Sequence, residues 1–247
     1  MKEVIVGDQL RGQVAVIIGG SSGMGEATGK LFALEGAKVA LAGRNKDALY
    51  RIVAEIKKGG GEASAIPTDA QDQEAVQKLI DGALGAYGRI DILVYSTGTN
   101  ITERSLAVVT KESWDMVIST NLSGAFYATK AVLPAMRKQG KGLIIYIASV
   151  AVPKPDISGV AYQASKHGMC GLAFATMVEE KTNGIRTSVI YPGIAHTPIV
   201  KKRPVPPPPE VLAKALQAED IAAACLFIAS LPPRAHVPEL HLSPSQL

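Results

Sequence analysis

Short apolar runs rich in β-branched residues alternate along this chain with segments of helical character. Such runs are typical of strands buried on both faces, and strands that alternate with helices form parallel βαβ units. Strands are expected at residues 14–18, 38–42, 63–66, 90–95, 143–148 and 185–191, with 239–242 as a candidate seventh. Helices are expected at about residues 49–58, 75–87, 111–138, 160–180 and 219–230. The pattern predicts an α/β fold, a Rossmann-like doubly wound parallel sheet of about seven strands flanked by helices.

The length and composition of the chain fit one ordinary globular domain. Its 247 residues suffice for one large core, and a hydrophobic fraction of 47% is usual for a folded protein. No internal repeat divides the chain, so we expect one domain over residues 1–247. Cys170 and Cys225 stand among small apolar residues, which favours packing in the core over a disulfide or a metal site.

The charge pattern argues against nucleic-acid and membrane partners. The net charge is +4, and the basic residues are spread along the chain. The one basic cluster, Lys201 to Arg203, adjoins a proline run and is interpreted as a solvated loop. The start of the chain lacks the apolar core of a signal peptide, and no apolar run approaches the roughly 18 residues of a membrane span. We therefore expect a cytoplasmic protein.

A glycine-rich turn, Gly19 to Gly25, joins the first expected strand to a helix. Glycines let the backbone approach a phosphate closely, and the free N–H groups at a helix N-terminus attract a pyrophosphate. Such a turn after the first strand of an α/β chain predicts a dinucleotide-binding site.

The end of the second strand bears on the choice of cofactor. In a doubly wound sheet this end lies over the adenosine ribose, where an acidic residue would bind the 2′-hydroxyl group of NAD. Here Gly43 holds that position, and Arg44 and Asn45 follow. A guanidinium group suits a 2′-phosphate, so Arg44 favours NADP(H), with NAD(H) as a second usable cofactor. The alternative is a surface arginine without a ligand.

Tyr162 and Lys166 form the pair with the most chemical content. They are four residues apart in a helical segment, so both side chains point to the same side. A free tyrosine has a pKa of about 10, and a fixed ammonium group nearby would lower that pKa toward the range of a useful proton donor. Taken alone, such a pair is more often a core-edge aromatic residue and a solvated charge.

Residues 198–209 interrupt the alternation with six prolines. Proline continues neither a helix nor a central strand, so we expect a loop here. Because the loop follows the last cofactor-side strand, it either covers the substrate or merely connects to the next helix.

Together these residues resemble the short-chain dehydrogenase/reductase family, from about residue 10 to the end of the chain. Ser149 precedes Tyr162 by 13 residues, Lys166 follows Tyr162 by four, and Asn121 precedes Ser149 by 28. These intervals are similar to those of the family's Asn–Ser–Tyr–Lys tetrad. The resemblance implies an NADP(H)-dependent oxidoreductase that interconverts a ketone or aldehyde and an alcohol.

The resemblance also implies a role for each matching position. Tyr162 would donate a proton to a carbonyl oxygen or accept one from an alcohol, while Lys166 would tune Tyr162 and hold the nicotinamide ribose. Ser149 would hydrogen-bond the reacting oxygen, and Asn121 would hold a water that links Lys166 to solvent. The expected cofactor contacts are Gly19, Ser21, Ser22, Gly23, Met24, Arg44, Asn45, Asp69, Ala70, Ser96, Gly98, Tyr162, Lys166, Pro192, Gly193, Ala195 and Thr197.

Three places depart from the usual pattern of the family. Ile18 replaces a threonine, the segment Tyr95 to Thr97 replaces Asn-Asn-Ala, and Tyr146 stands where a small or polar residue is usual. The first two changes remove side-chain hydrogen bonds that normally tie the cofactor-side strands together. We expect them to affect local cofactor affinity and stability rather than the chemistry.

Two other functions stay open. One is a 3-oxoacyl-type reductase, and the other is a dinucleotide-sensing protein without turnover, for which a Tyr/Lys acid would be unnecessary. The resemblance further implies a small-molecule substrate and a homotetramer or homodimer built on the helices around residues 111–138 and 160–181.

Overall fold

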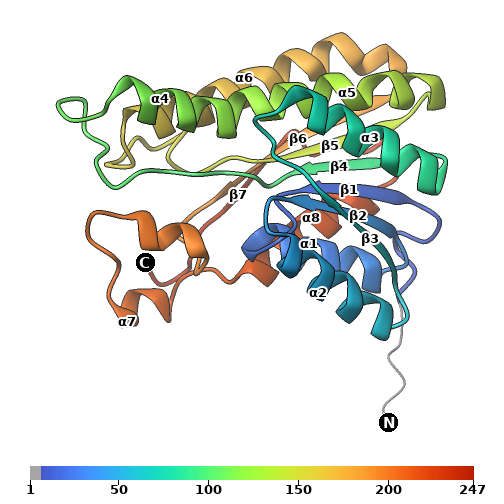
Figure 1. The fold of residues 1–247 in the computed structure, drawn as a ribbon, viewed down its shortest axis with the longest axis horizontal. Helices are drawn as coiled ribbons and strands as arrows, with labels where there is room; N and C mark the ends of the chain where they lie inside the picture. Colours follow the sequence, from blue (N-terminus) through green and yellow to red (C-terminus); the bar gives the residue numbers. More distant parts are fainter. Residues whose placement is uncertain (1–6) are drawn as a thin grey trace.

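Seven parallel strands form one sheet in the order β3-β2-β1-β4-β5-β6-β7 (Figure 1). The structure, a computed structural model, describes residues 7–247. The strands are β1 (Val14–Ile18), β2 (Lys38–Gly43), β3 (Glu62–Pro67), β4 (Ile92–Tyr95), β5 (Gly142–Ile147), β6 (Ile185–Pro192) and β7 (Glu239–Leu242). The predicted doubly wound α/β fold is confirmed, including the seventh strand, which pairs parallel with β6.

Helices cover both faces of this sheet (Figure 1). One layer contains α1 (Gly23–Leu34), α2 (Lys46–Lys58) and α8 (Ala218–Ser230), and the other contains α3 (Gln73–Tyr87), α4 (Lys111–Ile118), α5 (Gly124–Gln139) and α6 (Val160–Glu180). Each layer packs its apolar side chains against the sheet, which gives two buried clusters. Cys225 belongs to the first cluster and Cys170 to the second, and both are free, as expected for cysteines that serve packing.

The helix predicted over residues 111–138 is present, and its middle turn is π-helical rather than α-helical. A π-helix, η1 (Ser119–Ser123), separates α4 from α5. The hydroxyl group of Tyr95, at the end of β4, donates a hydrogen bond of 2.5 Å to the carbonyl oxygen of Thr120. A Cβ atom built on Gly124 would lie 2.3 Å from that hydroxyl oxygen, so glycine is needed for the phenol to reach the helix. The hydrogen bond from Tyr95, which lies on a distant strand, therefore accompanies the π-helical segment, and helical periodicity in the sequence cannot reveal it.

The two unusual tyrosines, Tyr95 and Tyr146, both hydrogen-bond to the helix layer. Tyr95 and Tyr146 are neighbours in the β4–β5 register, and both are fully buried. The hydroxyl group of Tyr146 hydrogen-bonds Thr129 in α5 at 2.7 Å. These departures thus join the centre of the sheet to the helices that cover it.

We expect Tyr95→Phe to lower the free energy of unfolding by about 1–3 kcal/mol, because the buried carbonyl group of Thr120 loses a hydrogen-bond donor. Urea denaturation followed by circular dichroism measures the change. Tyr50→Phe is the matched control, because it removes the same hydroxyl oxygen from a side chain that is 57% exposed. Equal stability of both variants would contradict a structural role for this hydrogen bond.

Two short helical turns lie in the proline-rich segment 198–209, so its description as a plain loop is wrong in detail. A 3-10 turn, η3 (Pro198–Lys202), begins the segment, and α7 (Pro209–Leu212) begins at its last proline. Proline is tolerated at the first helical position, where its missing N–H has no partner in any case. Figure 1 shows this part projecting from one end of the sheet. A further 3-10 turn, η2 (Lys181–Asn183), follows α6.

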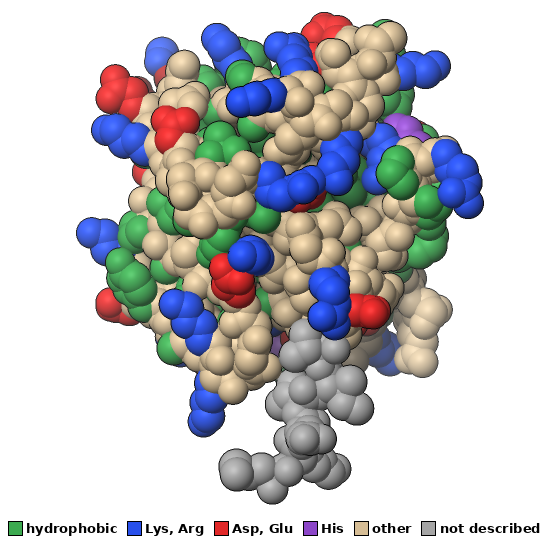
Figure 2. Space-filling model, turned by 90° about the vertical axis from the view of Figure 1, so that its right-hand side faces the viewer, with side chains coloured by type: hydrophobic (Ala, Val, Ile, Leu, Met, Phe, Trp, Pro, Cys, Tyr) green, Lys and Arg blue, Asp and Glu red, His purple; other side chains and the backbone are tan. Residues whose placement is uncertain are grey.

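The distribution of charge on one face and the apolar character of the helices bear on possible partners. On the face drawn in Figure 2, Lys and Arg side chains are scattered over the surface, and several of them also form a row across its upper middle and right part. Within residues 7–247, none of the helices combines the length and the apolar character needed to cross a bilayer.

Candidate active site

A cavity of about 410 Å³ opens where the strand order reverses between β1 and β4, at the carboxyl ends of the strands. Ligands bind at this place in doubly wound sheets. The structure brings all but two of the predicted site residues together along its wall. These are Gly19, Ser21, Ser22, Gly23, Met24, Arg44, Asp69, Ala70, Ser96, Gly98, Ser149, Tyr162, Lys166, Pro192, Gly193, Ala195 and Thr197. Asn45 and Asn121 do not line it.

The glycine turn is shaped by close backbone contacts. Gly19 has a φ of +94°, and a Cβ atom there would lie 2.7 Å from the backbone nitrogen of Thr97. A Cβ atom on Gly25 would lie 2.2 Å from the carbonyl oxygen of Gly19. Ser22 precedes α1 without a side-chain cap on the helix, so the first N–H groups of α1 have no side-chain acceptor from that residue. This turn fits the pyrophosphate of a dinucleotide.

Arg44 and Asn45, although adjacent, serve different purposes. Arg44 is exposed and lines the cavity at the end of β2. The side chain of Asn45 accepts a hydrogen bond of 3.0 Å from the backbone of Ala48 and so caps the N-terminus of α2. The cap uses the side-chain oxygen of Asn45, and a cofactor contact by this residue stays a prediction.

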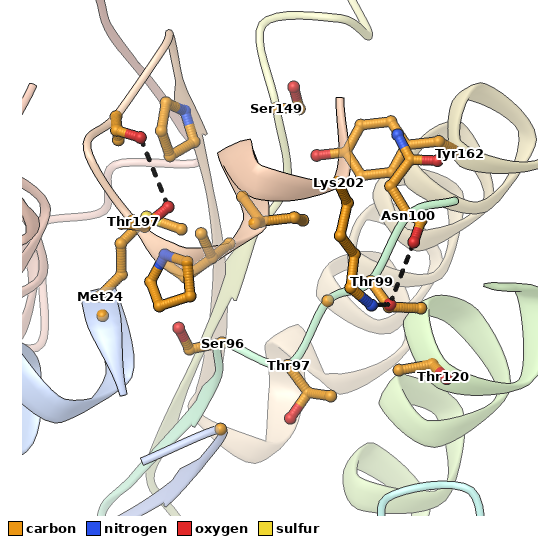
Figure 3. A pocket seen from close by; sticks show the side chains of 18 of the residues that line it. Met24, Ser96, Thr97, Thr99, Asn100, Thr120, Ser149, Tyr162, Thr197 and Lys202 are labelled. Carbon is orange, nitrogen blue, oxygen red and sulfur yellow. Dashed lines mark hydrogen bonds between the residues drawn. The ribbon is translucent and has the colours of Figure 1, made fainter. Parts of the chain in front are cut away.

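Tyr162, Ser149 and Lys166 meet at one end of the cavity. Tyr162 and Ser149 both face the open space in Figure 3. Lys166 is buried one helical turn after Tyr162, and its ammonium nitrogen lies 5.8 Å from the centre of the Tyr162 ring. That nitrogen donates a hydrogen bond of 2.7 Å to the carbonyl oxygen of Ile147 at the end of β5. The helical spacing thus places the pair as predicted.

The ionisation of Tyr162 differs from the expectation. Burial raises the pKa of Tyr162, and the carboxylate of Asp156 also raises it, while the hydroxyl group of Ser149 and the guanidinium groups of Arg203 and Arg104 act in the opposite direction. The net pKa is above the ordinary value, although a lowered one was predicted from Lys166. Burial also lowers the pKa of Lys166 itself, to about 8. Desolvation outweighs the nearby charges, so Tyr162 holds its proton at neutral pH.

Asn121 acts through its amide group on two other segments. It lies in η1 and is fully buried. Its side-chain oxygen accepts a hydrogen bond of 2.7 Å from the backbone of Thr99, and its nitrogen donates to the carbonyl oxygen of Thr99 and to the hydroxyl group of Ser165. Both N–H bonds are in use, so the amide ties the end of β4 to α6. The side chain of Asn121 therefore positions these segments, and the expected role of Asn121 in holding a water stays a prediction.

Several residues that line the cavity were not predicted as site residues from the sequence. Three of them, Asn100, Arg104 and Asp156, stand in loops that carry no recognisable motif. Lys202 and Arg203 were interpreted as part of a solvated loop, yet both line the cavity. Lys202 reaches across to the hydroxyl group of Thr99 at 2.6 Å, as Figure 3 shows. The basic cluster beside the prolines is visible in the sequence. Whether its side chains face the cavity or solvent depends on how the proline-rich segment folds back over the sheet.

We expect residues 198–209 to move as a lid over the substrate. Few contacts fasten it on the far side of the cavity, among them the Lys202–Thr99 hydrogen bond and a hydrogen bond from Arg104 to the carbonyl oxygen of Lys202. Hydrogen exchange should therefore be fast in the free protein and slower with NADPH bound. Strong protection of this segment to the same degree in both states would contradict the prediction.

Comparison with known proteins identifies the family. The model of the short chain dehydrogenase family matches residues 13–206. The chain belongs to the short-chain dehydrogenase family. This short-chain dehydrogenase is 30% identical over 236 residues to an uncharacterized oxidoreductase of Staphylococcus haemolyticus, with 96% of this chain and 99% of that protein covered. It is 34% identical over 228 residues to the 3-oxoacyl-[acyl-carrier-protein] reductase FabG of Thermotoga maritima, with 90% and 92% covered.

Solved structures agree with this assignment. A metagenomic short-chain oxidoreductase in complex with NADP has 31% sequence identity and a TM-score of 0.84, with 96% of this chain and 100% of that chain covered. The alcohol dehydrogenase of the archaeon Thermococcus sibiricus, complexed with 5-hydroxy-NADP, has 28% identity and a TM-score of 0.86, with 95% and 97% covered. The short-chain dehydrogenase described here is thus an oxidoreductase with a nicotinamide dinucleotide cofactor.

Proposed function

We propose that this protein is an NADP(H)-dependent oxidoreductase that interconverts a ketone or aldehyde and an alcohol, with Tyr162 as the general acid and base. The observation that carries the proposal is the meeting of Tyr162, Ser149 and Lys166 in the cavity that also contains the glycine turn. The fit of this turn to a pyrophosphate, together with the NADP-bound relatives, supports the cofactor.

The residues of the chain have distinct tasks in this reaction. A nicotinamide dinucleotide held in this cavity would supply or accept the hydride. Tyr162, whose raised pKa keeps it protonated, donates its proton to the carbonyl oxygen in the reducing direction. Ser149 hydrogen-bonds the same oxygen and stabilises the negative charge that grows there. Lys166, held on the carbonyl oxygen of Ile147, supplies positive charge behind Tyr162.

The remaining cavity residues would hold the cofactor in place. Ser21, Ser22 and the N-terminus of α1 would hold its phosphates, while Arg44 would pair with a 2′-phosphate. Asp69 and Ala70 would flank the adenine. The segment from Pro192 to Thr197 would line the nicotinamide, and Asn121 acts indirectly by joining β4 to α6.

A reductase of 3-oxoacyl thioesters is the second candidate, supported by the identity to FabG of Thermotoga maritima. A dinucleotide sensor without turnover has less support, because a sensor needs no proton donor such as Tyr162. The loss of NADPH absorbance with a panel of ketones, oxo esters and 3-oxoacyl thioesters separates the three. Oxidation of NADPH by none of them, at full occupancy of the cofactor site, would overturn the proposed function.

We further expect the chain to form a homodimer or homotetramer through α4, α5 and α6. Large apolar side chains stand exposed on these helices: Trp114 is 37% exposed, Phe126 44% and Val178 73%. Burial of such side chains against a second copy is favourable, and α4, α5 and α6 form one layer in Figure 1. Size-exclusion chromatography with light scattering gives the mass, and a monomer at micromolar concentration would contradict the prediction.

A further inference from the structure

The part of the cavity next to Tyr162 carries two guanidinium groups that the proposed reaction does not use. Arg104 comes from the loop between β4 and α4, and Arg203 directly follows η3. Both line the cavity, and the charges of both act on the ionisation of Tyr162. The two positive charges therefore lie near the expected position of the reacting oxygen.

Arg104 packs closely against the start of α6, the helix that carries Tyr162. Gly159 directly precedes α6 with a φ of +92°, and a Cβ atom there would lie 2.5 Å from the Cβ atom of Arg104. The side chain of Asn100 donates a hydrogen bond of 2.9 Å to the carbonyl oxygen of Ser158. Arg104 therefore lies close to the start of the helix that carries Tyr162, and the loop from Asn100 to Arg104 is hydrogen-bonded to the residue before Gly159.

Within residues 7–247, neither arginine has a carboxylate within the distance of an ion pair. Arg104 donates to the carbonyl oxygen of Lys202, but its Nε atom is buried and has no hydrogen-bond partner in this part of the chain. Asp156 also lines the cavity, yet its carboxylate accepts from the backbone of Ser158 at 2.9 Å. Burial and the charge of Arg203 lower the pKa of Arg104, and the charge of Asp156 opposes this shift without reversing it.

We propose that Arg104 and Arg203 form a carboxylate-binding site beside Tyr162, so that the preferred substrates are oxo acids and the corresponding hydroxy acids. This inference rests on the proposed function and names its substrate class. A buried N–H without a partner is costly, and a carboxylate offers a guanidinium group two charge-assisted hydrogen bonds in a matching plane. Arg44, at the end of β2, is left for the cofactor.

The test compares 2-, 3- and 4-oxo acids with their methyl esters, which share the ketone and lack the charge. For at least one pair, wild type should show kcat/KM at least about tenfold higher for the acid. Arg104→Gln should lower the acid-to-ester ratio of kcat/KM about 10- to 150-fold. Arg203→Gln should lower it about 2- to 5-fold, because Arg203 is exposed. Lys201→Gln is the matched control, since it removes one charge from the same segment outside this cavity.

Each result bears on one of the two proposals. If wild type reduces esters at least as well as acids, or if the arginine variants keep the ratio, the carboxylate site is wrong and the proposed function stands. If both variants instead weaken NADPH binding, measured by nucleotide fluorescence, the arginines serve the cofactor and the carboxylate site is again wrong.

A protein that turns over no ketone would overturn the proposed function but still leaves the carboxylate site to be judged. The readout is then the thermal stabilisation of the NADP⁺-loaded protein by 2-, 3- and 4-hydroxy acids. Stabilisation of wild type and of Lys201→Gln, but not of Arg104→Gln, supports the site. No stabilisation of wild type by any of these acids would overturn it.

Discussion

Tyr162→Phe should lower kcat on a reducible ketone by about 10²–10⁴-fold while the fold and NADPH binding persist. The substitution removes only the hydroxyl group that transfers the proton. Because burial raises the pKa of this group, it is present as the neutral donor at neutral pH. Steady-state kinetics with NADPH gives kcat, and quenching of protein fluorescence gives cofactor affinity.

Tyr50→Phe is the matched control for this substitution, since Tyr50 is exposed and does not line the cavity. It should behave as wild type in both measurements. A wild-type kcat for Tyr162→Phe would show that another group donates the proton.

The second large effect concerns cofactor choice. We expect wild type to prefer NADPH over NADH by about 10- to 150-fold in kcat/KM, because the guanidinium group of Arg44 makes charge-assisted hydrogen bonds to a 2′-phosphate. Gly43 removes the repulsion that a carboxylate at this position would cause. Arg44 has no carboxylate at ion-pair distance among residues 7–247, so it is available to a phosphate.

Gly43→Asp combined with Arg44→Ala should reverse the preference, mostly through KM for the cofactor. A Cβ atom on Gly43 would lie 3.0 Å from the hydroxyl oxygen of Ser21, so Ser21 must rotate slightly in this variant. The single variant Arg44→Ala avoids that complication and isolates the guanidinium group. If it leaves the NADPH-to-NADH ratio of kcat/KM unchanged, Arg44 faces solvent and does not bind the phosphate.

Tyr95 and Tyr146, which depart from the usual residues of the family, make hydrogen bonds of their own in the core. The changes at Ile18 and at Tyr95 to Thr97 predict lost hydrogen bonds at the cofactor-side strands, whereas Tyr146 carries no such prediction. In the structure, both phenols are buried and hydrogen-bonded to helices of one layer. A buried tyrosine needs a partner for its hydroxyl group, and Gly124 provides the space that lets Tyr95 reach one.

The strand and helix pattern, the glycine turn and the Tyr162–Lys166 pair were predictable from the sequence because each is local. Apolar runs of a strand's length and glycines after the first strand depend on neighbours in the chain, and a spacing of four places two side chains on one helix face. These features suffice for the seven-stranded sheet and for most of the cavity wall.

Tertiary structure decided what depends on contacts between distant segments. Asn121 hydrogen-bonds Thr99, which is 22 positions away in the sequence, and Ser165, which is 44 positions away. Lys202 hydrogen-bonds Thr99, from which it is separated by 103 positions. The proton affinity of Tyr162 depends on desolvation outweighing the charges of Arg104 and Arg203, which no spacing in the sequence reveals. The sequence determined the sheet and the candidate proton donor, whereas hydrogen-bond competition, burial and the folding-back of the proline-rich segment determined the surroundings of that donor.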